Sequence, residues 1–377
     1  RAYETADELR AMREAATLAG RAPHYPGHWR DRVPGPEQEG QPFAIRIKAP
    51  RGGSTVVEDL VQGRVEVAHA ELDDMIILRS DGTPTYLHAV VVDDHDMAIT
   101  HVIRGDDHLT NTFRQCMVYD AMGWHRPRFG HIPLIHGADG AKLSKRHGAL
   151  GVEAYRDELG ILPEALCNYL LRLGWGHGDD EIISRDQAIA WFDIDAVGRS
   201  PSRFDVKKLE NINGHYLREA DDARLANIVA PLVGTADVDL LTRAMPVLKS
   251  RAKSTLELSD GARFLFAERP LALDDGASAL LNDKGLALLG TLRSALDTIE
   301  WTGPAIEAAI RAVAEAASLG LGKVAQPLRA ALTGRTTSPG IFDVPILLGR
   351  ETTLGRLDDA LVGRNARGVE QGNNADG

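Results

Sequence analysis

Two hydrophobic patterns follow one another in the first 85 residues. Apolar positions at helical spacing come after a capping-box sequence, and apolar positions at every second place come later. The helical set is Leu9, Met12 and Ala16 after Thr5-Ala6-Asp7-Glu8, and the alternating sets are Phe43, Ile45 and Ile47, then Val65 and Val67. A capping box predicts a helix start, and alternation with period two predicts half-buried antiparallel strands. We therefore expect residues 1–85 to be mixed α/β.

The next pattern, between residues 99 and 135, predicts a βαβ unit. The run of residues 99–104, in which Ile99, Val102 and Ile103 are apolar, predicts a strand, and a second run, 129–135, is bounded by Gly and Pro. Between the runs, apolar residues recur at helical spacing, at Leu109, Phe113, Cys116 and Met117. Ligands of doubly wound sheets bind at the carboxyl ends of the strands. Arg104 and the loop 142–146 are expected at two such ends.

From about residue 150 the pattern is helical. Ser184-Arg185-Asp186-Gln187 is a second capping box, which opens a helix through Trp191. After residue 220 the chain is rich in Ala and Leu, and turn sequences interrupt it, which predicts a helical array. The segment from Gly363 onward has almost no apolar content and is predicted to be disordered.

The composition is that of a large enzyme rather than a membrane protein. With 377 residues, 44% of them hydrophobic and 26% charged, the chain can bury a substantial core, and we expect two or three domains. No apolar stretch approaches the length of a membrane span. Cys116 and Cys167 fall in amphipathic helical patterns and are expected to be buried thiols. Two cysteines make no disulfide framework, which suits a reducing cytosol.

The net charge opposes nonspecific binding to nucleic acid. Lys and Arg total 43 against 54 Asp and Glu, a formal net charge of −11. Nucleic-acid-binding proteins usually carry a basic footprint. A nucleic-acid partner would therefore have to bind local basic stripes on an acidic body.

One such basic cluster follows the second apolar run. Gly140–Gly148 holds two lysines, one arginine and a hydroxyl between glycines. A flexible cationic loop of this kind can close on a polyphosphate and neutralise the charge of a leaving phosphate. Taken alone, the cluster favours a solvated basic turn, which describes most short Lys/Arg clusters.

Further motifs surround this loop. They are Thr85-Tyr86, Val90–Met97 and His101–Leu109 before it, and Gly151–Tyr155, Asn168–Trp175 and Arg203–Leu209 after it. Lys142-Leu143-Ser144-Lys145-Arg146 itself resembles the second signature of class I aminoacyl-tRNA synthetases. In this order the motifs resemble those of glutamyl-tRNA synthetases, and the resemblance runs from Tyr3 to about Leu361.

The resemblance implies a fold class and a division into domains. The fold is α/β, with a partial Rossmann-like nucleotide-binding core and an α/β acceptor-binding insertion, followed by all-α stem-contact and anticodon-binding domains. The expected boundaries are 1–85 for the insertion, 86–150 for the second half of the catalytic core, 151–220 for the stem-contact domain, 221–362 for the anticodon-binding domain and 363–377 for a disordered tail.

The resemblance also implies two glutamate-binding residues. Arg104 is expected to hold the side-chain carboxylate of the substrate, because a guanidinium binds a carboxylate bidentately. Tyr86 is expected to contact the same amino acid. An ion pair of Arg104 with Asp106 or Asp107 is the alternative for the arginine, and a core position is the alternative for the tyrosine.

Other site residues follow from the same resemblance. Lys142, Ser144, Lys145 and Arg146 are the expected catalytic residues, and Lys145, Asp106 and Asp107 are expected at ATP. Arg199, Arg203, Lys207 and Lys208 are expected at tRNA phosphates, with an ordinary solvated surface as the alternative for each.

The implied activity is ATP-dependent attachment of L-glutamate to tRNA through glutamyl adenylate, with Mg²⁺ accompanying ATP. No zinc is predicted, because the insertion contains no cysteine. Asp93-Asp94-His95-Asp96 would point in different directions on a helix, so they are interpreted as caps and ion pairs rather than a metal site. We expect a cytoplasmic monomer that binds the tRNA for glutamate. Charging of the tRNA for glutamine stays open.

One family motif is absent. The first class I signature, His-x-Gly-His, occurs nowhere in the sequence, which begins with Arg1. We expect a chain that lacks its N-terminal segment and by itself binds tRNA but forms little adenylate. If the first signature is naturally absent, a non-catalytic tRNA-binding protein is favoured instead. The gene sequence upstream of Arg1 decides between these two possibilities. Glutamyl-queuosine and glutaminyl-tRNA synthetases fit less well, since the former lack the C-terminal helical region and the latter end in β-barrels.

Overall fold

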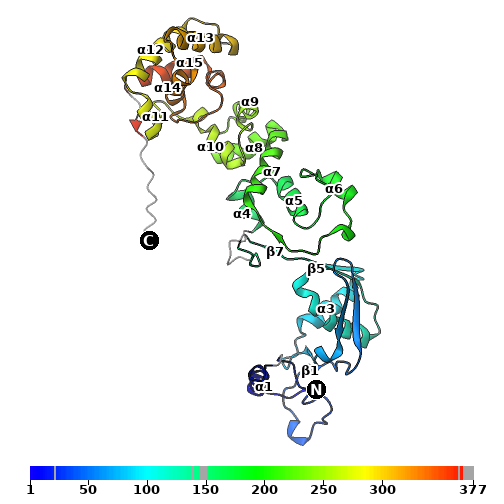
Figure 1. Cartoon of the computed structure of the whole chain (residues 1–377). Helices are drawn as coiled ribbons and strands as arrows, with labels where there is room; N and C mark the ends of the chain where they lie inside the picture. Colours follow the sequence, from blue (N-terminus) through cyan, green and yellow to red (C-terminus); the bar gives the residue numbers. More distant parts are fainter. Residues whose placement is uncertain (21–22, 138, 144–150, 364–365, 368–377) are drawn as a thin grey trace. The chain divides into compact units, whose positions relative to one another are not determined.

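The computed structural model describes residues 1–377 except 21–22, 138, 144–150, 364–365 and 368–377. The chain divides into two compact units (Figure 1). Unit 1 comprises Arg1–Ala149 and Leu170–Asp205, and unit 2 comprises Leu150–Tyr169 and Val206–Gly377. Each unit therefore contains segments that are distant in sequence. The finer division into four domains and a tail remains a prediction.

Unit 1 begins with the predicted helix and strands. Helix α1 (Ala6–Leu18) starts at Thr5, whose Oγ1 accepts a hydrogen bond from the Glu8 backbone N–H, so the capping box is confirmed. The strands form two antiparallel pairs: β1 (Ile45–Arg46) with β4 (Ile76–Leu78), and β2 (Ser54–Asp59) with β3 (Gly63–Ala68). In the second pair, Val65 and Val67 are more buried than their neighbours, as the alternation predicts.

The βαβ unit is also confirmed. Its elements, after helix α2 (Tyr86–Asp96), are β5 (His101–Gly105), α3 (Leu109–Met122) and β6 (Arg128–Ile132). Strands β5 and β6 are parallel, with Arg104 opposite His131. Phe113, Cys116 and Met117 of α3 pack into the core with Phe129. The crossover helix thus covers the sheet through the apolar positions that the pattern indicated.

The predicted strand 129–135 is wrong as a single element. The chain forms β6, breaks, and then forms β7 (Ile135–His136), which pairs in parallel with β8 (Ser202–Arg203) instead of β5. Pro133 lies in the break, and a proline has no N–H to donate to a strand ladder. The second part of the run is therefore free to pair with a segment that comes about seventy residues later in the sequence.

Unit 2 is built of helices. Those of its first part are α4 (Val152–Asp157), most of α5 (Pro163–Arg172), α7 (Val206–Glu219), α8 (Asp222–Val233), α9 (Val238–Leu248) and α10 (Thr255–Phe266). The second part contains α11 (Asp275–Leu280), α12 (Asp283–Asp297), α13 (Gly303–Ala316), α14 (Leu321–Thr333) and α15 (Asp343–Leu361), which gather into one bundle (Figure 1). The predicted helical array is confirmed, and so is the helix after the second capping box, α6 (Arg185–Trp191) in unit 1.

Two expectations fail in detail. Cys116 is buried but Cys167 is exposed, because it lies on the outer side of α5. Within the predicted tail, the backbone of β10 (Ala366–Arg367) pairs in parallel with β9 (Ala272–Leu273), so these two residues are not disordered. Backbone pairing does not require apolar side chains, which is why composition alone misjudged them. Residues 364–365 and 368–377 lie outside the described residues.

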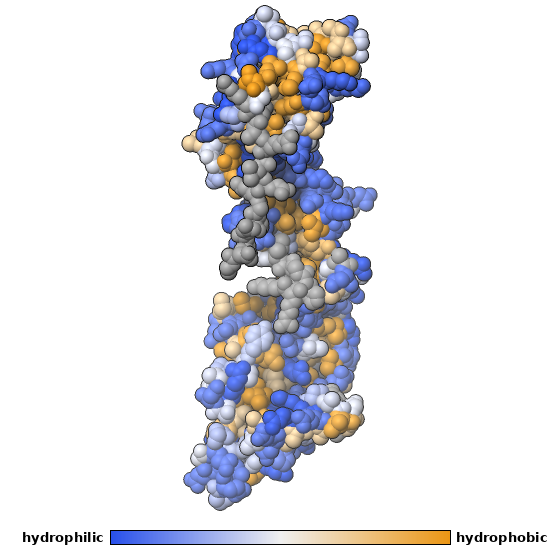
Figure 2. Space-filling view, turned by 90° about the vertical axis from the view of Figure 1, so that its left-hand side faces the viewer, coloured by the Kyte–Doolittle hydropathy of each residue, from blue (hydrophilic) through white to orange (hydrophobic). Residues whose placement is uncertain are grey.

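The surface shows hydrophobic patches separated by hydrophilic residues on the face seen in Figure 2. In the described part of the chain, no single helix has both the length and the apolar character of a membrane span. Helices α8 and α9 reach these values only when taken together, across a bend of 110°.

Candidate active site around Arg104

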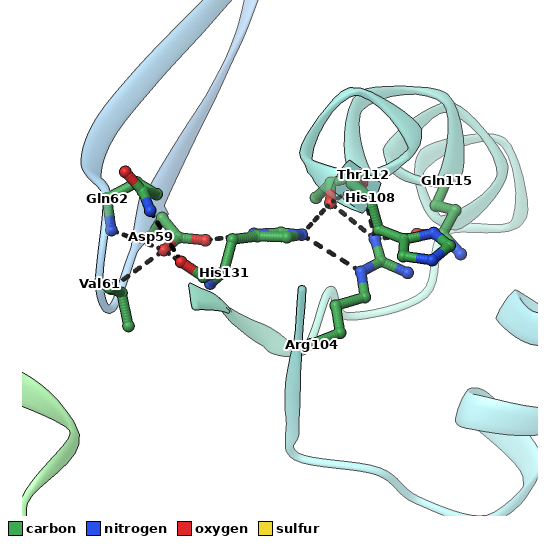
Figure 3. Close-up of polar contacts among 8 residues, drawn as sticks. All are labelled: Asp59, Val61, Gln62, Arg104, His108, Thr112, Gln115 and His131. Carbon is green, nitrogen blue, oxygen red and sulfur yellow. Dashed lines mark hydrogen bonds and ion pairs between the residues drawn. The ribbon is translucent and has the colours of Figure 1, made fainter. Parts of the chain in front are cut away.

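Arg104 lies near the carboxyl end of β5, beside the first turns of α3. Its Nη2 donates hydrogen bonds to Oγ1 of Thr112 and Oε1 of Gln115, both at 2.7 Å, and lies 3.4 Å from the carbonyl of His108. Its Nε donates to Nε2 of His131 at 3.2 Å (Figure 3). Among the described residues, no carboxylate forms an ion pair with this guanidinium. The predicted alternative, an ion pair with Asp106 or Asp107, is therefore wrong for the described structure.

His131 in turn contacts a buried aspartate. Its Nδ1 lies 2.6 Å from Oδ2 of Asp59, and both side chains are fully inaccessible to solvent. Oδ1 of Asp59 accepts the backbone N–H groups of Val61, Gln62 and His131 at 2.9 to 3.0 Å. The carboxylate thus closes the turn between β2 and β3 and docks that hairpin onto β6. Figure 3 shows the continuous chain of contacts from Asp59 through His131 to Arg104.

Burial and hydrogen bonding set the ionisation of these groups. Burial lowers the pKa of Arg104 and also that of His131, since both charged forms lose hydration. For His131 the neighbouring Asp59 opposes this shift but does not cancel it. Burial raises the pKa of Asp59, but hydrogen bonds from the backbone of Gln62 and from His131 outweigh it and leave the pKa below its usual value. Asp59 is therefore ionised and His131 neutral near neutral pH.

Tyr86 stands near Arg104, at the start of α2. Its ring centroid is 6.4 Å from that of His108, whose backbone carbonyl contacts Arg104. The residue is 55% exposed, so the alternative of a buried core aromatic is wrong. The structure thus brings the two predicted glutamate-binding residues together around His108.

Lys142 and Asp107 form an ion pair. Nζ of Lys142 lies 2.7 Å from Oδ2 of Asp107, and this partner lowers the pKa of the carboxyl. Asp106 and Asp107 directly follow β5, so their predicted place beside the strand end is correct. Ser144, Lys145 and Arg146, the other predicted residues of the basic loop, lie outside the described residues.

The four predicted tRNA-binding residues do not belong to one unit. Arg199 and Arg203 are exposed in unit 1, and Lys207 and Lys208 lie on α7 in unit 2. Arg203 is the last residue of β8, which pairs with β7, so its backbone lies beside the strand that leads to the basic loop. Arg199 lies over the β2–β3 turn, where a Cβ added to Gly63 would meet its guanidinium at 3.2 Å.

The acidic cluster on α2 was interpreted as caps and ion pairs, and this is wrong for its two middle members. Asp94 accepts a hydrogen bond from the hydroxyl of Tyr119 at 3.4 Å, and the ring of His95 stacks on Trp124 at 3.9 Å. The described residues contain no group of three or more His, Cys, Asp or Glu side chains that converge as metal ligands.

Sequence reasoning missed the residues that surround Arg104, namely Asp59, Thr112, Gln115 and His131, all of which are buried. One signal was available: His131 interrupts an apolar strand run, and a buried polar side chain requires a partner. The identity of that partner is a tertiary property, because Asp59 lies 72 residues earlier.

Comparison with known proteins agrees with this architecture. Residues 1–211 match the model of tRNA synthetases class I (E and Q), catalytic domain, and residues 222–361 match an anticodon binding domain. A glutamate–tRNA ligase 2 of Rhizorhabdus wittichii is 65% identical over 370 residues, which cover 96% of this chain and 78% of the relative. One from Zymomonas mobilis is 61% identical over 368 residues, covering 95% and 76%.

The fold is likewise similar to solved structures. The crystal structure of a glutamate tRNA ligase from Elizabethkingia meningosepticum, in complex with its amino acid, has a TM-score of 0.82 at 30% sequence identity, and the match covers 96% of this chain and 78% of that one. A glutamate-tRNA synthetase from Elizabethkingia anophelis has a TM-score of 0.79. With a catalytic-domain match over more than half of its length and relatives above 60% identity, the chain belongs to the class I tRNA synthetases (E and Q).

Proposed function

We propose that this protein attaches L-glutamate to tRNA in an ATP-dependent reaction with a glutamyl-adenylate intermediate. Its family membership and its relatives, which are named glutamate–tRNA ligases, support a synthetase over a non-catalytic tRNA-binding protein. The glutamate site is proposed at Arg104 and Tyr86. The single observation that carries this assignment is the half-buried guanidinium of Arg104, held by neutral acceptors and without an ion pair among the described residues.

A half-buried cation without an ion-pair partner loses part of its hydration uncompensated, which is unfavourable by itself. A substrate carboxylate would supply the missing charge and could bind bidentately. Tyr86 is exposed beside this group and can contact the same substrate. The arrangement favours glutamate over glutamine, because a neutral amide would leave the guanidinium uncompensated.

The reaction needs no nucleophilic side chain. The α-carboxylate of glutamate attacks the α-phosphate of ATP in line, and pyrophosphate leaves. A hydroxyl of the terminal adenosine of tRNA then takes the acyl group, and AMP leaves. The protein contributes positioning and charge neutralisation. Lys142, together with Lys145, is proposed to bind the leaving pyrophosphate.

ATP would enter with Mg²⁺. Because the described residues offer no cluster of metal ligands, the phosphate oxygens would supply most of the coordination, as is usual for this ion. Asp106 and Asp107 are proposed to contact the nucleotide. Asp107 can release Lys142 when phosphate arrives, since the two side chains are 37% and 54% exposed.

The tRNA partner is proposed to contact both units. The match to an anticodon binding domain over residues 222–361 supports contact with the tRNA by unit 2. Arg199, Arg203, Lys207 and Lys208 are proposed phosphate contacts. The expected partner is the tRNA for glutamate, and charging of the tRNA for glutamine is to be tested with both tRNAs. A cytoplasmic monomer is the proposed state.

The test compares Arg104→Ala with a matched control in the full-length enzyme. Loss of the guanidinium should raise the KM for glutamate at least about tenfold, because truncating one partner of a buried charged pair costs about 2–5 kcal/mol. The KM for ATP should change by less than about twofold if the ATP site is separate from the glutamate site. Arg114→Ala is the control. Arg114 lies on α3, the helix that contacts Arg104, but it forms an ion pair with Asp73 at 3.4 Å. Equal changes for glutamate and ATP would remove Arg104 from the glutamate site.

A further inference from the structure

The hydrogen bonds of Arg104 leave one edge of its guanidinium available. A guanidinium has five N–H donors and no acceptor. The Nε–H group points to His131, and Nη2 has close acceptors at Thr112 and Gln115. Among the described residues, none accepts a hydrogen bond from Nη1. Three neutral contacts therefore fix the orientation of the group and leave the two N–H bonds of Nη1 for a ligand.

The contact with His131 determines which imidazole nitrogen carries the proton. Because Nε of Arg104 is a donor, Nε2 of His131 must be an unprotonated acceptor. Oγ1 of Thr112, 3.0 Å from the same nitrogen, can donate to it as well. The proton of the neutral ring is then on Nδ1, where it meets Oδ2 of Asp59 at 2.6 Å. The donor and acceptor pattern is consistent along the whole chain of contacts in Figure 3.

Asp59 is itself held rigidly. Three backbone N–H groups bind its Oδ1, and this leaves Oδ2 to accept from His131. Gln62 also donates from Nε2 to the backbone carbonyl of His131 at 2.9 Å, so the turn and the strand are joined twice. A carboxylate in this position accepts only, and therefore selects the Nδ1–H form of the imidazole.

We propose that Asp59 and His131 are positioning residues for substrate binding: Asp59 keeps the Nδ1–H tautomer of His131, and His131 thereby holds Arg104 with Nη1 directed to the substrate carboxylate. This inference rests on the proposed role of Arg104 in binding glutamate. Neither residue touches the substrate. Their contribution is to present the guanidinium in one orientation, so that the bound carboxylate does not have to order it.

The first test is Asp59→Asn, which changes one oxygen to an amide nitrogen. The Asn oxygen can keep the backbone hydrogen bonds of the turn, while its amide donates to Nδ1 of His131. The ring must then carry its proton on Nε2, where it opposes the Nε–H of Arg104. We expect ¹⁵N NMR of histidine-labelled enzyme to show this change of tautomer. The KM for glutamate should rise about tenfold or more, as expected for a lost hydrogen bond to a charged group, with the KM for ATP within about twofold.

A pair of variants at His131 separates positioning from structural support. In His131→Gln, the terminal amide reaches the place of Nε2, so it can still accept the hydrogen bond from Arg104 but cannot form the one to Asp59. In His131→Asn, the shorter amide reaches the place of Nδ1, so it keeps the hydrogen bond to Asp59 and loses the one from Arg104. The proposal requires a larger increase in the KM for glutamate in His131→Asn than in His131→Gln. The reverse order, or equal increases that follow the loss of thermal stability, would overturn it.

Asp74→Asn is the matched control for Asp59→Asn. Both aspartates are buried in unit 1, each with 5% of the whole residue exposed. Asp74 also accepts a backbone N–H, that of Ala49 at 2.8 Å, but its charged partner is Arg30. We expect it to lower the melting temperature without a selective change for glutamate. The same selective change in Asp74→Asn, or an unchanged KM for glutamate in Asp59→Asn, would overturn the proposal. An unchanged KM in Arg104→Ala would instead refute the proposed glutamate site.

Discussion

Nζ of Lys142 lies 2.7 Å from Oδ2 of Asp107, so the first lysine of the basic loop is paired with an aspartate that follows the strand of Arg104. Both side chains are substantially exposed, and ion pairs of this kind contribute about 0–1 kcal/mol to stability. The pair can therefore open at little cost when a stronger anion is present. It holds the start of the loop beside the strand end while leaving its charge available to phosphate.

This relationship predicts a separation between stability and rate. Lys142→Ala should lower the rate of adenylate formation about tenfold or more, because a charge at the developing anion is lost. Its free energy of unfolding should change by less than about 1 kcal/mol. Stopped-flow measurement and thermal unfolding check the two parts. Lys48→Ala, which removes a similarly exposed ion pair with Asp31, is the control and should change neither.

Lys145 is expected to contribute more than Lys142, since the resemblance assigns it directly to the pyrophosphate. Lys145→Ala in the full-length enzyme should slow adenylate formation about a hundredfold, which corresponds to roughly 3 kcal/mol. Its affinity for tRNA should stay nearly constant. Single-turnover kinetics and a filter-binding titration test this. A rate equal to that of the unsubstituted enzyme would contradict the catalytic role and favour the interpretation of the loop as an ordinary solvated turn.

The pKa of His131 predicts how stability depends on pH. Burial lowers this pKa, although Asp59 and Asp106 oppose the shift and Arg104 adds to it. Below about pH 6.5 the unfolded chain therefore binds a proton that the folded protein excludes. Stability should fall as the pH falls from about 7.5 to 5.5, with a contribution from this site of at most about 1.4 kcal/mol per pH unit.

His131→Gln removes the titrating group and provides the comparison. The variant should be less stable than the unsubstituted protein at about pH 7.5 but should lose less stability on acidification. The titration of Asp59 does not overlap with this pH range. Because its pKa is lowered in the folded protein, its contribution to stability is lost only in more acid solution. Chemical denaturation at several pH values measures the difference. Parallel pH curves for the two proteins would contradict a neutral His131 in the folded state.

Gly160 is a glycine of unit 2 at which both the backbone conformation and the lack of space exclude a side chain. Its φ is +66°, and an added Cβ would lie 2.9 Å from the backbone nitrogens of Thr255 and Leu256. The carbonyl of Gly160 accepts from the N–H of Thr255 at 3.0 Å, and the amide of Asn213 bridges this junction. Gly160→Ala should therefore destabilise the protein by more than about 2 kcal/mol, since strain and displacement of backbone add.

A second glycine separates the two effects. Gly234 ends α8 with a φ of +78°, but an added Cβ would meet no atom within 4 Å. Gly234→Ala should cost only the conformational strain, about 1–2 kcal/mol. Denaturant unfolding of both variants measures the difference. Similar losses for the two would show that the close approach of residues 255 and 256 contributes little.

Local signals were sufficient for several elements of unit 1. The capping boxes at Thr5 and Ser184 start helices α1 and α6, and the spacing of Phe113, Cys116 and Met117 marks the buried face of α3. Such features depend on neighbours within a few residues, so they can be deduced from sequence. The break at Pro133 was also a local signal, and it was overlooked.

Resemblance to a family identified Arg104 and Tyr86, and the structure brings both to one place around His108. It did not identify Asp59 or His131. Their pairing depends on how the β2–β3 hairpin docks onto β6, and no periodicity records a contact between residues 72 positions apart. The amino-acid sequence by itself determined several of the elements, the order of the motifs and the residue that we propose to bind the substrate. Only the tertiary structure decided how that residue is held, because burial and hydrogen-bond partners arise when separate elements pack together.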